Sequence, residues 1–474
     1  MVHVVVIGAY GSAGAAVAGE LADEPGVELT LVDDGDPGGG LCILRGCMPS
    51  KEVLSAAAHR FQARHDDRLV GGLPAVDLER TVTRKDDHTL GWAGHRRESV
   101  HDLAEHENVE FVHDTARFVD DHTVAAGGRE FEADYVVVAT GSSVNVPATP
   151  GIDDVDYMTS ADVLDATDLP DSGIVMGFGY IGMELVPYLT EAGGMDLTVV
   201  EHDDRPIDEA DPEFGDAALA LYEEHFDVTI PTNCYERRLE PTDDGGVRLH
   251  VEFADGTTDA YEADQLFLFT GRRPTLAGLG LEHTPIEPDE YTGQPQDWVR
   301  ETMQARDDDR VFVVGDVNGK EPILHVAKEQ GFTAAENILR HSRGADLRAY
   351  RNVHHHVIFS GLGVYPFARV GHSERSAREA GYDIAVASRQ ASDDGVFKSK
   401  DVPEGLAKLV VDRQDGTVLG WQGLHHHADV MAKTLQVVVE LGLDVRDIPD
   451  RAYHPTTPEI LDGLVRDCAD AVEE

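Results

Sequence analysis

The stretch Ile174–Glu201, which reads IVMGFGYIGMELVPYLTEAGGMDLTVVE, contains the complete pattern of a dinucleotide-binding unit. A short apolar strand runs into a GxGxxG loop, a helix follows through Glu184–Glu191, and Glu201 closes the next strand. The loop glycines are Gly177, Gly179 and Gly182. Glycines at this spacing let the backbone approach a pyrophosphate at the helix N-terminus, and a carboxylate about 20 residues on binds the ribose. Strand, loop, helix and acid together predict a nucleotide site.

A second glycine loop lies near the N-terminus and reads GxxGxxG. Its glycines are Gly8, Gly11 and Gly14. The third glycine, Gly14, lies 19 positions before Asp33, just as Gly182 lies 19 positions before Glu201. The first glycine, however, lies 25 positions before Asp33, against 24 positions from Gly177 to Glu201. The spacing predicts one extra residue in the turn, with the helix and Asp33 in place. Tyr10, inside this loop, is expected to change how the backbone wraps the phosphates.

The rest of the chain divides into two kinds of segment. The apolar run Val311–Val314 ends in Gly315-Asp316 and precedes a predicted helix from about Pro322 to Leu339. Because alternating strands and helices indicate parallel sheets, we predict an α/β fold with two Rossmann-like units. The tail from about Ala349 is predicted to be a separate α+β domain, with its stretch Ala391–Gly405 as a loop. Its expected strands and helices are Ala407–Val411, Val418–Gln422, Ala428–Leu441 and Pro458–Ala471.

Composition places the chain among globular proteins of several domains. Its 474 residues are too many for one core, and 41% of them are hydrophobic. The longest apolar runs are far shorter than a membrane span, and no basic stretch precedes the apolar residues of the N-terminus. We therefore expect a cytoplasmic protein without a membrane partner.

Charge is the most unusual global property. The chain has 89 acidic and 39 basic residues, a net charge of −50, and the acidic residues are spread along the whole sequence. This predicts a uniformly acidic, solvated surface whose self-repulsion needs strong screening, as in a cytosol of very high salt. Nucleic acid is excluded as a partner by the same charge.

Two of the four cysteines lie close together, in the run Gly38–Lys51, GGGLCILRGCMPSK. The four residues between Cys42 and Cys47 do not suit a zinc site, and no second pair completes one, so no metal site is predicted. A kinked helical turn brings such cysteines within disulfide range, and a helix N-terminus and a nearby cation favour thiolates. The pattern favours a redox-active dithiol over two structural thiols. Cys234 and Cys468 stand alone and are expected to be inert.

The run GGLCILRGCMPSK resembles the redox motif of the flavoprotein disulfide reductases, the family of dihydrolipoyl dehydrogenase, glutathione reductase and mercuric reductase. Further motifs occur in the order of that family along the whole chain, and together they are specific. They are Ala139-Thr140-Gly141, Gly177–Gly182, Thr270–Pro274 (TGRRP), Gly315-Asp316 and His454–Glu459 (HPTTPE).

This resemblance implies a domain order, two cofactors and a partner. It implies an FAD-binding domain in residues 1–150 and 269–345, an NAD(P)-binding domain in 151–268, and an α+β dimerisation domain in 346–474. The implied assembly is a homodimer whose active site is shared between subunits. The residues implied to bind FAD are Gly8, Gly11, Gly14, Asp33, Lys51, Thr140, Gly141, Gly271 and Asp316. Those implied to bind the nicotinamide cofactor are Gly177, Gly179, Gly182 and Glu201.

The resemblance also assigns catalytic roles. Cys42 would attack the substrate, and Cys47 would lie against the flavin as its charge-transfer thiolate. Lys51 and Glu184 match the ion pair that the family places near the flavin N5. His454 matches the acid–base residue, which reaches the cysteines of the other subunit, and Glu459 would orient its imidazole. The local sequence fits, because Thr457 and Pro458 are suited to the start of a helix that follows His454.

Two features depart from the family pattern or add to it. Leu41 stands where threonine is frequent, which removes a hydroxyl near the flavin. The tail holds two histidine triplets, His354–His356 and His425–His427. Neighbours in a triplet point in different directions, so surface or substrate contact is favoured over metal binding.

The substrate remains open between several classes. A small disulfide is favoured: lipoamide, as for a dihydrolipoyl dehydrogenase, or bis-γ-glutamylcystine, which the halophile-like composition suggests. The alternative is a mercuric ion. Mercuric reductases of this family usually end in a vicinal cysteine pair and lack the HPTxxE histidine, whereas this chain has only Cys468 near its end. A redox sensor or scaffold would not need His454. Glu201 favours NAD(H), although Arg205 lies close enough to blur that preference.

Overall fold

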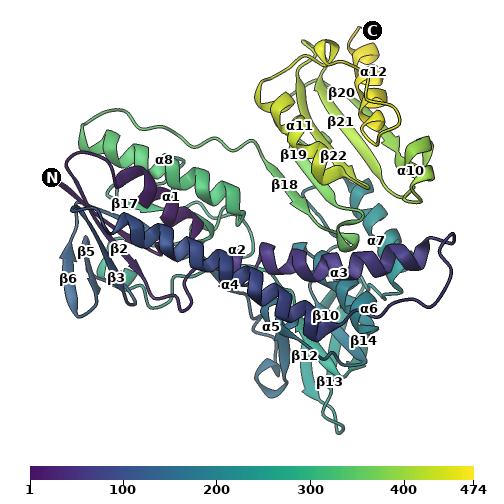
Figure 1. Ribbon diagram of the computed structural model, residues 1–474, viewed down its shortest axis with the longest axis horizontal. Coiled ribbons are helices and arrows are strands. Elements are labelled where there is room, and N and C mark those ends of the chain that lie inside the picture. Colours follow the sequence, from purple (N-terminus) through teal and green to yellow (C-terminus); the bar gives the residue numbers. More distant parts are fainter. Residues whose placement is uncertain (474) are drawn as a thin grey trace. The chain divides into compact units, whose positions relative to one another are not determined.

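The computed structural model describes residues 1–473, which form two compact units (Figure 1). Each unit is built from three stretches of the chain. Unit 1 consists of Met1–Pro49, Arg84–Asn145 and Gly271–Asn352. Unit 2 consists of Ser50–Thr83, Val146–Thr270 and the chain from Val353.

Unit 1 is organised around a five-stranded parallel sheet of strand order β17-β7-β1-β2-β3. The strands are β1 (Val2–Ile7), β2 (Val27–Asp33), β3 (Val109–His113), β7 (Tyr135–Val138) and β17 (Val311–Val313). The central strands are runs of valine, leucine and isoleucine, and Val4, Val5 and Val6 are fully buried. Such runs suit a strand that is covered on both faces, so the parallel sheet follows from the sequence.

Helices α1 (Ser12–Leu21) and α8 (Leu324–Ser342) lie side by side in unit 1 (Figure 1). They pack closely because small residues face each other: a Cβ added at Gly331 would lie 2.6 Å from the carbonyl oxygen of Ala13. The other helices are α2 (Leu41–Leu44), α4 (Leu78–Leu103) and α3 (Cys47–His65), of which the last two continue into unit 2. Two small antiparallel sheets are formed by β4 (Arg117–Asp120), β5 (Thr123–Ala126) and β6 (Arg129–Glu132), and by β8 (Ser142–Val144) and β16 (Arg272–Pro274).

Unit 2 contains a second parallel sheet, of order β11-β10-β15-β9. Its strands are β9 (Tyr157–Thr159), β10 (Ser172–Met176), β11 (Asp196–Val200) and β15 (Gln265–Leu268). The associated helices are α5 (Ser160–Asp165), α6 (Tyr180–Gly193) and α7 (Pro212–Phe226). An antiparallel sheet of β12 (Cys234–Pro241), β13 (Val247–Phe253) and β14 (Thr258–Ala263) completes this part. Both glycine loops therefore lie between a parallel strand and a helix, as predicted.

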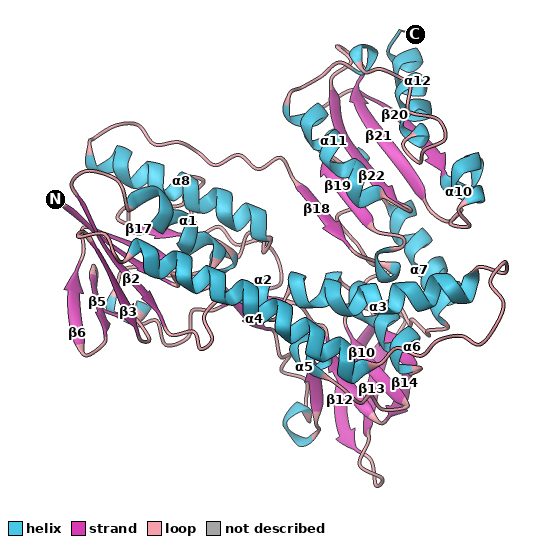
Figure 2. Cartoon of the chain, viewed as in Figure 1, coloured by secondary structure: helices cyan, strands magenta, loops and turns pink. Residues whose placement is uncertain are grey.

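The tail forms a five-stranded antiparallel sheet, β18-β19-β22-β21-β20, shown in magenta in Figure 2. The strands are β18 (His355–Ile358), β19 (Phe367–Gly371), β20 (Ile384–Gln390), β21 (Leu406–Asp412) and β22 (Val418–Leu424). Helix α11 (Ala428–Glu440) packs on β19 and β22, and α12 (Glu459–Glu473) packs on β20 and β21. This confirms the predicted α+β character of the tail.

Two details of the tail differ from the sequence prediction. The segment Ala391–Gly405 was expected to be a loop, but it contains the short helix α10 (Gly395–Ser399). Another short helix, α9 (Glu374–Glu379), precedes strand β20. The Asp394 side chain accepts a hydrogen bond from the Val396 backbone N–H at 2.7 Å, and Phe397 is fully buried. A polar stretch thus folds into a helix because one cap and one aromatic anchor suffice. Helix α12 begins at Glu459, one residue after the predicted Pro458.

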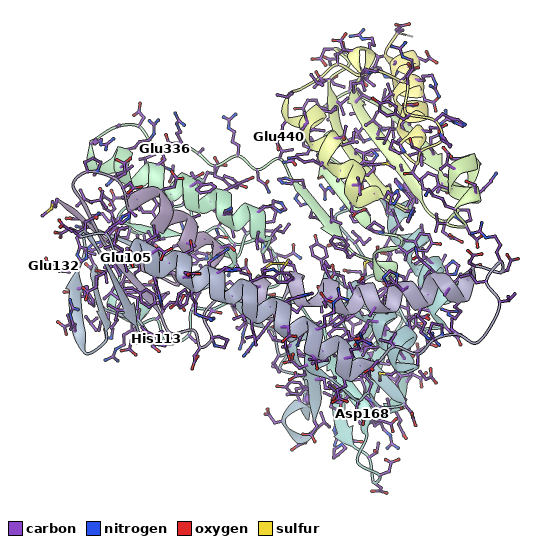
Figure 3. All side chains as sticks on the ribbon, viewed as in Figure 1. Glu105, His113, Glu132, Asp168, Glu336 and Glu440 are labelled. Carbon is purple, nitrogen blue, oxygen red and sulfur yellow. A yellow bond between two sulfur atoms is a disulfide. The ribbon has the colours of Figure 1, made fainter. Side chains whose placement is uncertain are left out.

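Acidic side chains project from both units, as the labelled residues Glu105, Glu132, Asp168, Glu336 and Glu440 illustrate (Figure 3). The negative charge is therefore distributed over the surface and is not confined to one segment. Across residues 1–473, every helix is too short or too polar to span a bilayer.

The surface charge leads to a prediction about salt. Raising KCl from about 0.1 M to above 1 M shortens the Debye length from roughly 10 Å to about 3 Å, which suppresses repulsion among surface carboxylates. We expect the midpoint of thermal unfolding, measured by circular dichroism, to rise steadily over this range. A midpoint that does not change with KCl would show that repulsion contributes little to stability.

Candidate active site

Cys42 and Cys47 form a disulfide at the junction of α2 and α3, with their Cα atoms 5.0 Å apart. Helix α2 ends at Leu44, Arg45 leaves the helical conformation with a φ of −141°, and α3 begins at Cys47. This kink is the one that the spacing predicted, and the separation lies in the ordinary disulfide range. Cys47 is exposed and Cys42 is half-buried.

The other two cysteines are not suited to exchange. Cys234 and Cys468 are both fully buried. Burial raises the pKa of Cys234 to about 11 and that of Cys468 to about 12. A thiol held neutral in this way is a poor nucleophile, so the expectation that both are inert agrees with their surroundings.

The first glycine loop brings the backbone of β1 and α1 into close contact. A Cβ at Gly14 would lie 2.1 Å from the carbonyl oxygen of Gly8, so no larger residue fits there. Gly11 is the N-cap residue of α1 and offers no side chain, which leaves the first N–H groups of the helix uncapped. The two carboxylate oxygens of Asp33 accept hydrogen bonds from the backbone N–H groups of Tyr10 and Gly35, each at 2.9 Å.

The second loop repeats this construction in unit 2. A Cβ at Gly182 would lie 2.5 Å from the carbonyl oxygen of Gly177, and Gly179 is the N-cap residue of α6 without a side-chain cap. Glu201 accepts hydrogen bonds from the backbone N–H groups of Phe178 and Asp203, each at 3.0 Å. Burial raises the pKa values of both Asp33 and Glu201, and these N–H bonds oppose the increase.

A comparison of the two loops locates the extra residue. The carboxylate binds the N–H of Phe178, one position after the first glycine, in unit 2, but the N–H of Tyr10, two positions after it, in unit 1. The N–H of Ala9 does not reach Asp33; instead, the N–H groups of Gly8 and Ala9 both donate to the carbonyl of Val32. The additional residue is therefore Ala9, and the helix and its carboxylate keep their relation.

Tyr10 points into the core of unit 1. Its ring is 5.2 Å from that of Phe111, its hydroxyl is 2.7 Å from Nε2 of His101, and it is 3% exposed. Arg96 donates to the Tyr10 carbonyl at 3.3 Å, and Arg97 donates to the Gly38 carbonyl at 2.9 Å. Side chains of α4 thus hold the first loop in place through hydrogen bonds to Tyr10 and Gly38. The sequence alone did not reveal this role of α4.

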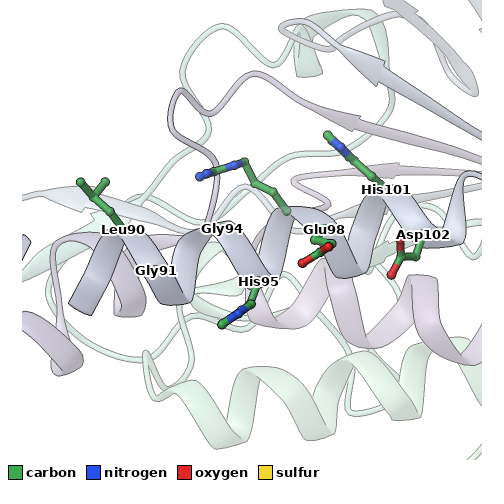
Figure 4. A pocket seen from close by; sticks show the side chains of 8 residues that line it. Leu90, Gly91, Gly94, His95, Glu98, His101 and Asp102 are labelled. Atoms are coloured by element: carbon green, nitrogen blue, oxygen red, sulfur yellow. The ribbon is translucent and has the colours of Figure 1, made fainter. Parts of the chain in front are cut away.

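Helix α4 lines a pocket of about 540 Å³ (Figure 4). Its lining comes from successive turns of this one helix, namely Leu90, Gly91, Gly94, His95, Arg97, Glu98, His101 and Asp102. None of the predicted site residues lines it, so we do not assign the chemistry to this pocket.

The remaining predicted cofactor residues of unit 1 lie at strand ends. The Thr140 hydroxyl donates to the Thr275 carbonyl at 2.8 Å, beside Gly141. Asp316 accepts a hydrogen bond from the Ser142 hydroxyl at 2.6 Å, and Arg272, next to Gly271, donates to the same hydroxyl at 2.9 Å. Ser142 was missed in the sequence, although its place directly after the Ala-Thr-Gly motif was a signal.

Lys51 and Glu184 form the predicted ion pair in unit 2. The ammonium nitrogen is 2.7 and 2.6 Å from the two carboxylate oxygens, and it lies 4.4 Å from the centre of the Phe359 ring. Glu184 also accepts hydrogen bonds from the Phe359 backbone N–H at 3.1 Å and from the Ser50 hydroxyl. Burial lowers the pKa of Lys51, while Glu184 opposes this and favours the charged form.

His454 and Glu459 are also paired. Nδ1 of His454 is 3.0 Å from a Glu459 oxygen that accepts a second hydrogen bond, also at 3.0 Å, from the Thr456 backbone N–H. The hydrogen bond with His454 lowers the pKa of Glu459, so the carboxylate stays ionised and acts as an acceptor. Nδ1 therefore carries a proton, and Nε2 is left on a side chain that is 79% exposed.

The two histidine triplets are engaged within the protein. In the first, His356 bridges His354 at 3.0 Å and Glu209 at 3.2 Å. In the second, His425 is fully buried between Phe397 and Trp421, and burial lowers its pKa to about 4. His425 therefore is not the surface contact that the sequence suggested. Among residues 1–473 no cluster of metal-ligating side chains occurs.

Both loops satisfy the requirements of a dinucleotide site. Each has an uncapped helix N-terminus for a pyrophosphate, a glycine whose missing side chain leaves the approach open, and a carboxylate that keeps acceptor capacity for ribose hydroxyls. Unit 1 holds one such loop together with the disulfide. Unit 2 holds the other, together with the Lys51–Glu184 and His454–Glu459 pairs.

Known proteins share this sequence pattern along almost the whole chain. A mercuric reductase from Bacillus cereus is 29% identical over 445 residues, covering 92% of this chain and 67% of that protein. A dihydrolipoyl dehydrogenase from Haloferax volcanii is 29% identical over 471 residues, covering 96% and 94%. Among solved structures, LpdA from Mycobacterium tuberculosis superposes with a TM-score of 0.81 at 23% identity, covering 98% of this chain and 99% of that one. This last likeness concerns the fold.

The family models agree with these relatives and confirm the resemblance. Residues 2–331 match the model of the pyridine nucleotide-disulphide oxidoreductases, and residues 357–464 match the dimerisation domain of the same group. The family uses FAD and a pyridine nucleotide. The chain therefore belongs to the pyridine nucleotide-disulphide oxidoreductase family and is a flavoprotein disulfide oxidoreductase.

Proposed function

We propose that this enzyme transfers electrons between NAD(H) and a small disulfide through the Cys42–Cys47 pair. One observation carries the proposal: a single chain combines this disulfide with a hydrogen-bonded His454–Glu459 pair. A dithiol that reduces a disulfide needs both a nucleophilic thiolate and a group that manages the protons of the departing thiols. The first glycine loop is assigned to FAD and the second to the pyridine nucleotide.

FAD, when bound, supplies the two-electron transfer between the nicotinamide and the cysteine pair. In the reduced enzyme, the Cys42 thiolate attacks one sulfur of the substrate and forms a mixed disulfide. The first substrate thiolate leaves and takes a proton from His454. The Cys47 thiolate then attacks the sulfur of Cys42, which re-forms the Cys42–Cys47 disulfide and releases the second thiolate. The substrate gains the two electrons that the cysteine pair loses.

We assign His454 to the active site of a second subunit. The match of residues 357–464 to the dimerisation domain supports a homodimer. The 79% exposure of the His454 side chain supports presentation outward, and the Glu459 carboxylate fixes the ring so that Nε2 is free to exchange protons.

A disulfide is favoured over a mercuric ion, although mercuric reductases are among the relatives. Reduction of a metal ion to the element releases no thiol and does not require a proton donor, whereas His454 and Glu459 supply one. A vicinal pair of cysteines near the C-terminus would favour metal capture. This chain has only Cys468 there, and that thiol is fully buried.

The first prediction concerns His454. His454→Gln removes the proton donor, so turnover with a disulfide should fall by at least about 100-fold, since general acid–base catalysis contributes roughly 10²–10⁴-fold. Steady-state assays in multimolar KCl should compare lipoamide, bis-γ-glutamylcystine and mercuric ion. The matched control is His283→Gln, an exposed histidine of unit 1. Near-normal disulfide turnover by His454→Gln, or fast turnover of mercuric ion alone, would contradict the proposal.

The preference for NAD(H) rests on the charged residues that follow strand β11, first of all Glu201. Glu201 presents a carboxylate, which suits ribose hydroxyls and repels an additional phosphate. Arg205 is the cation that would favour such a phosphate, but its guanidinium is 2.8 Å from Asp216 and 2.9 Å from Asp204. These carboxylates offset its charge, so we propose NADH over NADPH.

The second prediction tests this preference. Glu201→Gln keeps the size of the side chain but removes the charge, so kcat/KM for NADH should fall by about tenfold, the value of one charge-assisted hydrogen bond, while kcat/KM for NADPH should rise. Glu223→Gln, an exposed site on α7, serves as control. If the wild-type enzyme used NADPH more efficiently than NADH, the assignment would be wrong.

Arg45 favours a substrate that carries carboxylates. It lies between the two cysteines, its side chain is exposed, and within residues 1–473 its guanidinium makes no hydrogen bond or ion pair. In a chain with 89 acidic residues, an uncommitted arginine in the redox turn is well placed to bind an anion. We therefore propose bis-γ-glutamylcystine as the preferred disulfide over the neutral lipoamide.

The third prediction follows. Arg45→Met should raise KM for bis-γ-glutamylcystine by about fivefold to tenfold, since it removes a charge-assisted contact, and should leave KM for lipoamide unchanged. Arg80→Met, an exposed position of α4, changes the net charge equally and serves as control. Equal losses for both disulfides would show that Arg45 does not select for charge.

A further inference from the structure

We infer that His427 is a positioning residue for the His454–Glu459 pair and acts through Thr457. The inference rests on the proposed acid–base role of His454. It concerns the second histidine triplet, whose third member contacts the segment that carries His454.

The contact is a hydrogen bond between two side chains of unit 2. Nδ1 of His427 lies 3.0 Å from the Thr457 hydroxyl oxygen, and Thr457 is only 3% exposed. Thr457 directly follows Thr456, whose N–H holds Glu459, and its own carbonyl accepts the N–H of Ile460 at 3.3 Å. The position of Thr457 therefore determines where Glu459 and the first turn of α12 lie.

His427 is itself held firmly. It follows β22, a strand buried along its whole length, and its carbonyl accepts the Met431 N–H as the N-cap residue of α11. Its backbone is left-handed, with a φ of 69°, and its ring lies 3.8 Å from that of His426, which contacts the Val364 carbonyl at 3.2 Å. The His427 ring is therefore held in a fixed position at the start of α11, close to the end of β22.

The segment before α12 has no regular secondary structure of its own, so its position depends on side-chain contacts with neighbouring elements. Residues 449–458 form neither helix nor strand, and Tyr453 and His454 are largely exposed. Other hydrogen bonds hold the segment to α12: Ala452 N–H to Asp462, and Arg466 to Asp450. Among the hydrogen bonds of residues 1–473, the one between His427 and Thr457 joins this segment to the start of α11, directly after the sheet strand β22. This hydrogen bond therefore fixes the segment that carries His454 to the rest of the dimerisation domain, residues 357–464.

The test uses matched variants of both partners. His427→Gly removes the side chain but accepts the left-handed backbone, whereas His427→Asn also tolerates that backbone and keeps a donor at the place of Nδ1. Thr457→Val removes the hydroxyl at nearly constant volume, and Thr457→Ser keeps it. Each holoenzyme is assayed with NADH and with bis-γ-glutamylcystine or lipoamide, and kcat/KM is determined for each substrate.

We expect kcat/KM for the disulfide to fall by roughly fivefold in His427→Gly and in Thr457→Val, the value of one hydrogen bond, with kcat/KM for NADH unchanged. The double variant should be no worse than either single one, because both remove the same interaction. His427→Asn and Thr457→Ser should retain activity. A merely structural role would lower both kcat/KM values together through loss of active enzyme.

Two results would overturn the inference: equal losses for NADH and disulfide, or losses that multiply in the double variant. Either is distinguishable from failure of the proposed function, which His454→Gln decides separately. If His454→Gln abolishes disulfide turnover while the His427 and Thr457 variants show independent effects, only the positioning role is wrong.

Discussion

The close approach of backbone to backbone at the third glycine of each nucleotide loop is the constraint on which the structure depends. At Gly14 and Gly182 a single added Cβ would lie 2.1 and 2.5 Å from a carbonyl oxygen of the preceding turn. Only this approach lets α1 and α6 begin directly beside their sheets with uncapped N–H groups. The placement of Asp33 and Glu201 beside the two proposed nucleotide sites follows from it.

The residues to which we assign the chemistry are divided between the two units. The dithiol begins α3 in unit 1, whereas the Lys51–Glu184 and His454–Glu459 pairs belong to unit 2. In each pair a carboxylate lies within hydrogen-bonding distance of a side-chain nitrogen, but Lys51 is half-buried whereas His454 is exposed. This difference fits a fixed charge near a cofactor in the first case and a proton donor for a departing thiol in the second.

Much of the fold could be predicted because its signals are local. Glycine spacing identified both loops, alternation of strands and helices identified the parallel sheets, and the cysteine spacing identified the kinked turn. What could not be predicted depends on residues far apart in sequence: the support of Tyr10 by His101, the bond between Ser142 and Asp316, and that between His427 and Thr457. His425 was misjudged because it is buried against Phe397 and Trp421, which lie far from it or are not marked by any local sequence pattern.

The central claim is that electrons from NADH reach the Cys42–Cys47 disulfide. The most direct measurement is anaerobic treatment of the holoenzyme with NADH, followed by alkylation with iodoacetamide and mass spectrometry of the peptides. The account predicts that Cys42 and Cys47 become alkylated only after NADH is added, while Cys234 and Cys468, which are fully buried, stay unlabelled. If NADH bleaches the flavin absorbance but Cys42 and Cys47 remain joined as a disulfide that dithiothreitol can open, the account is contradicted.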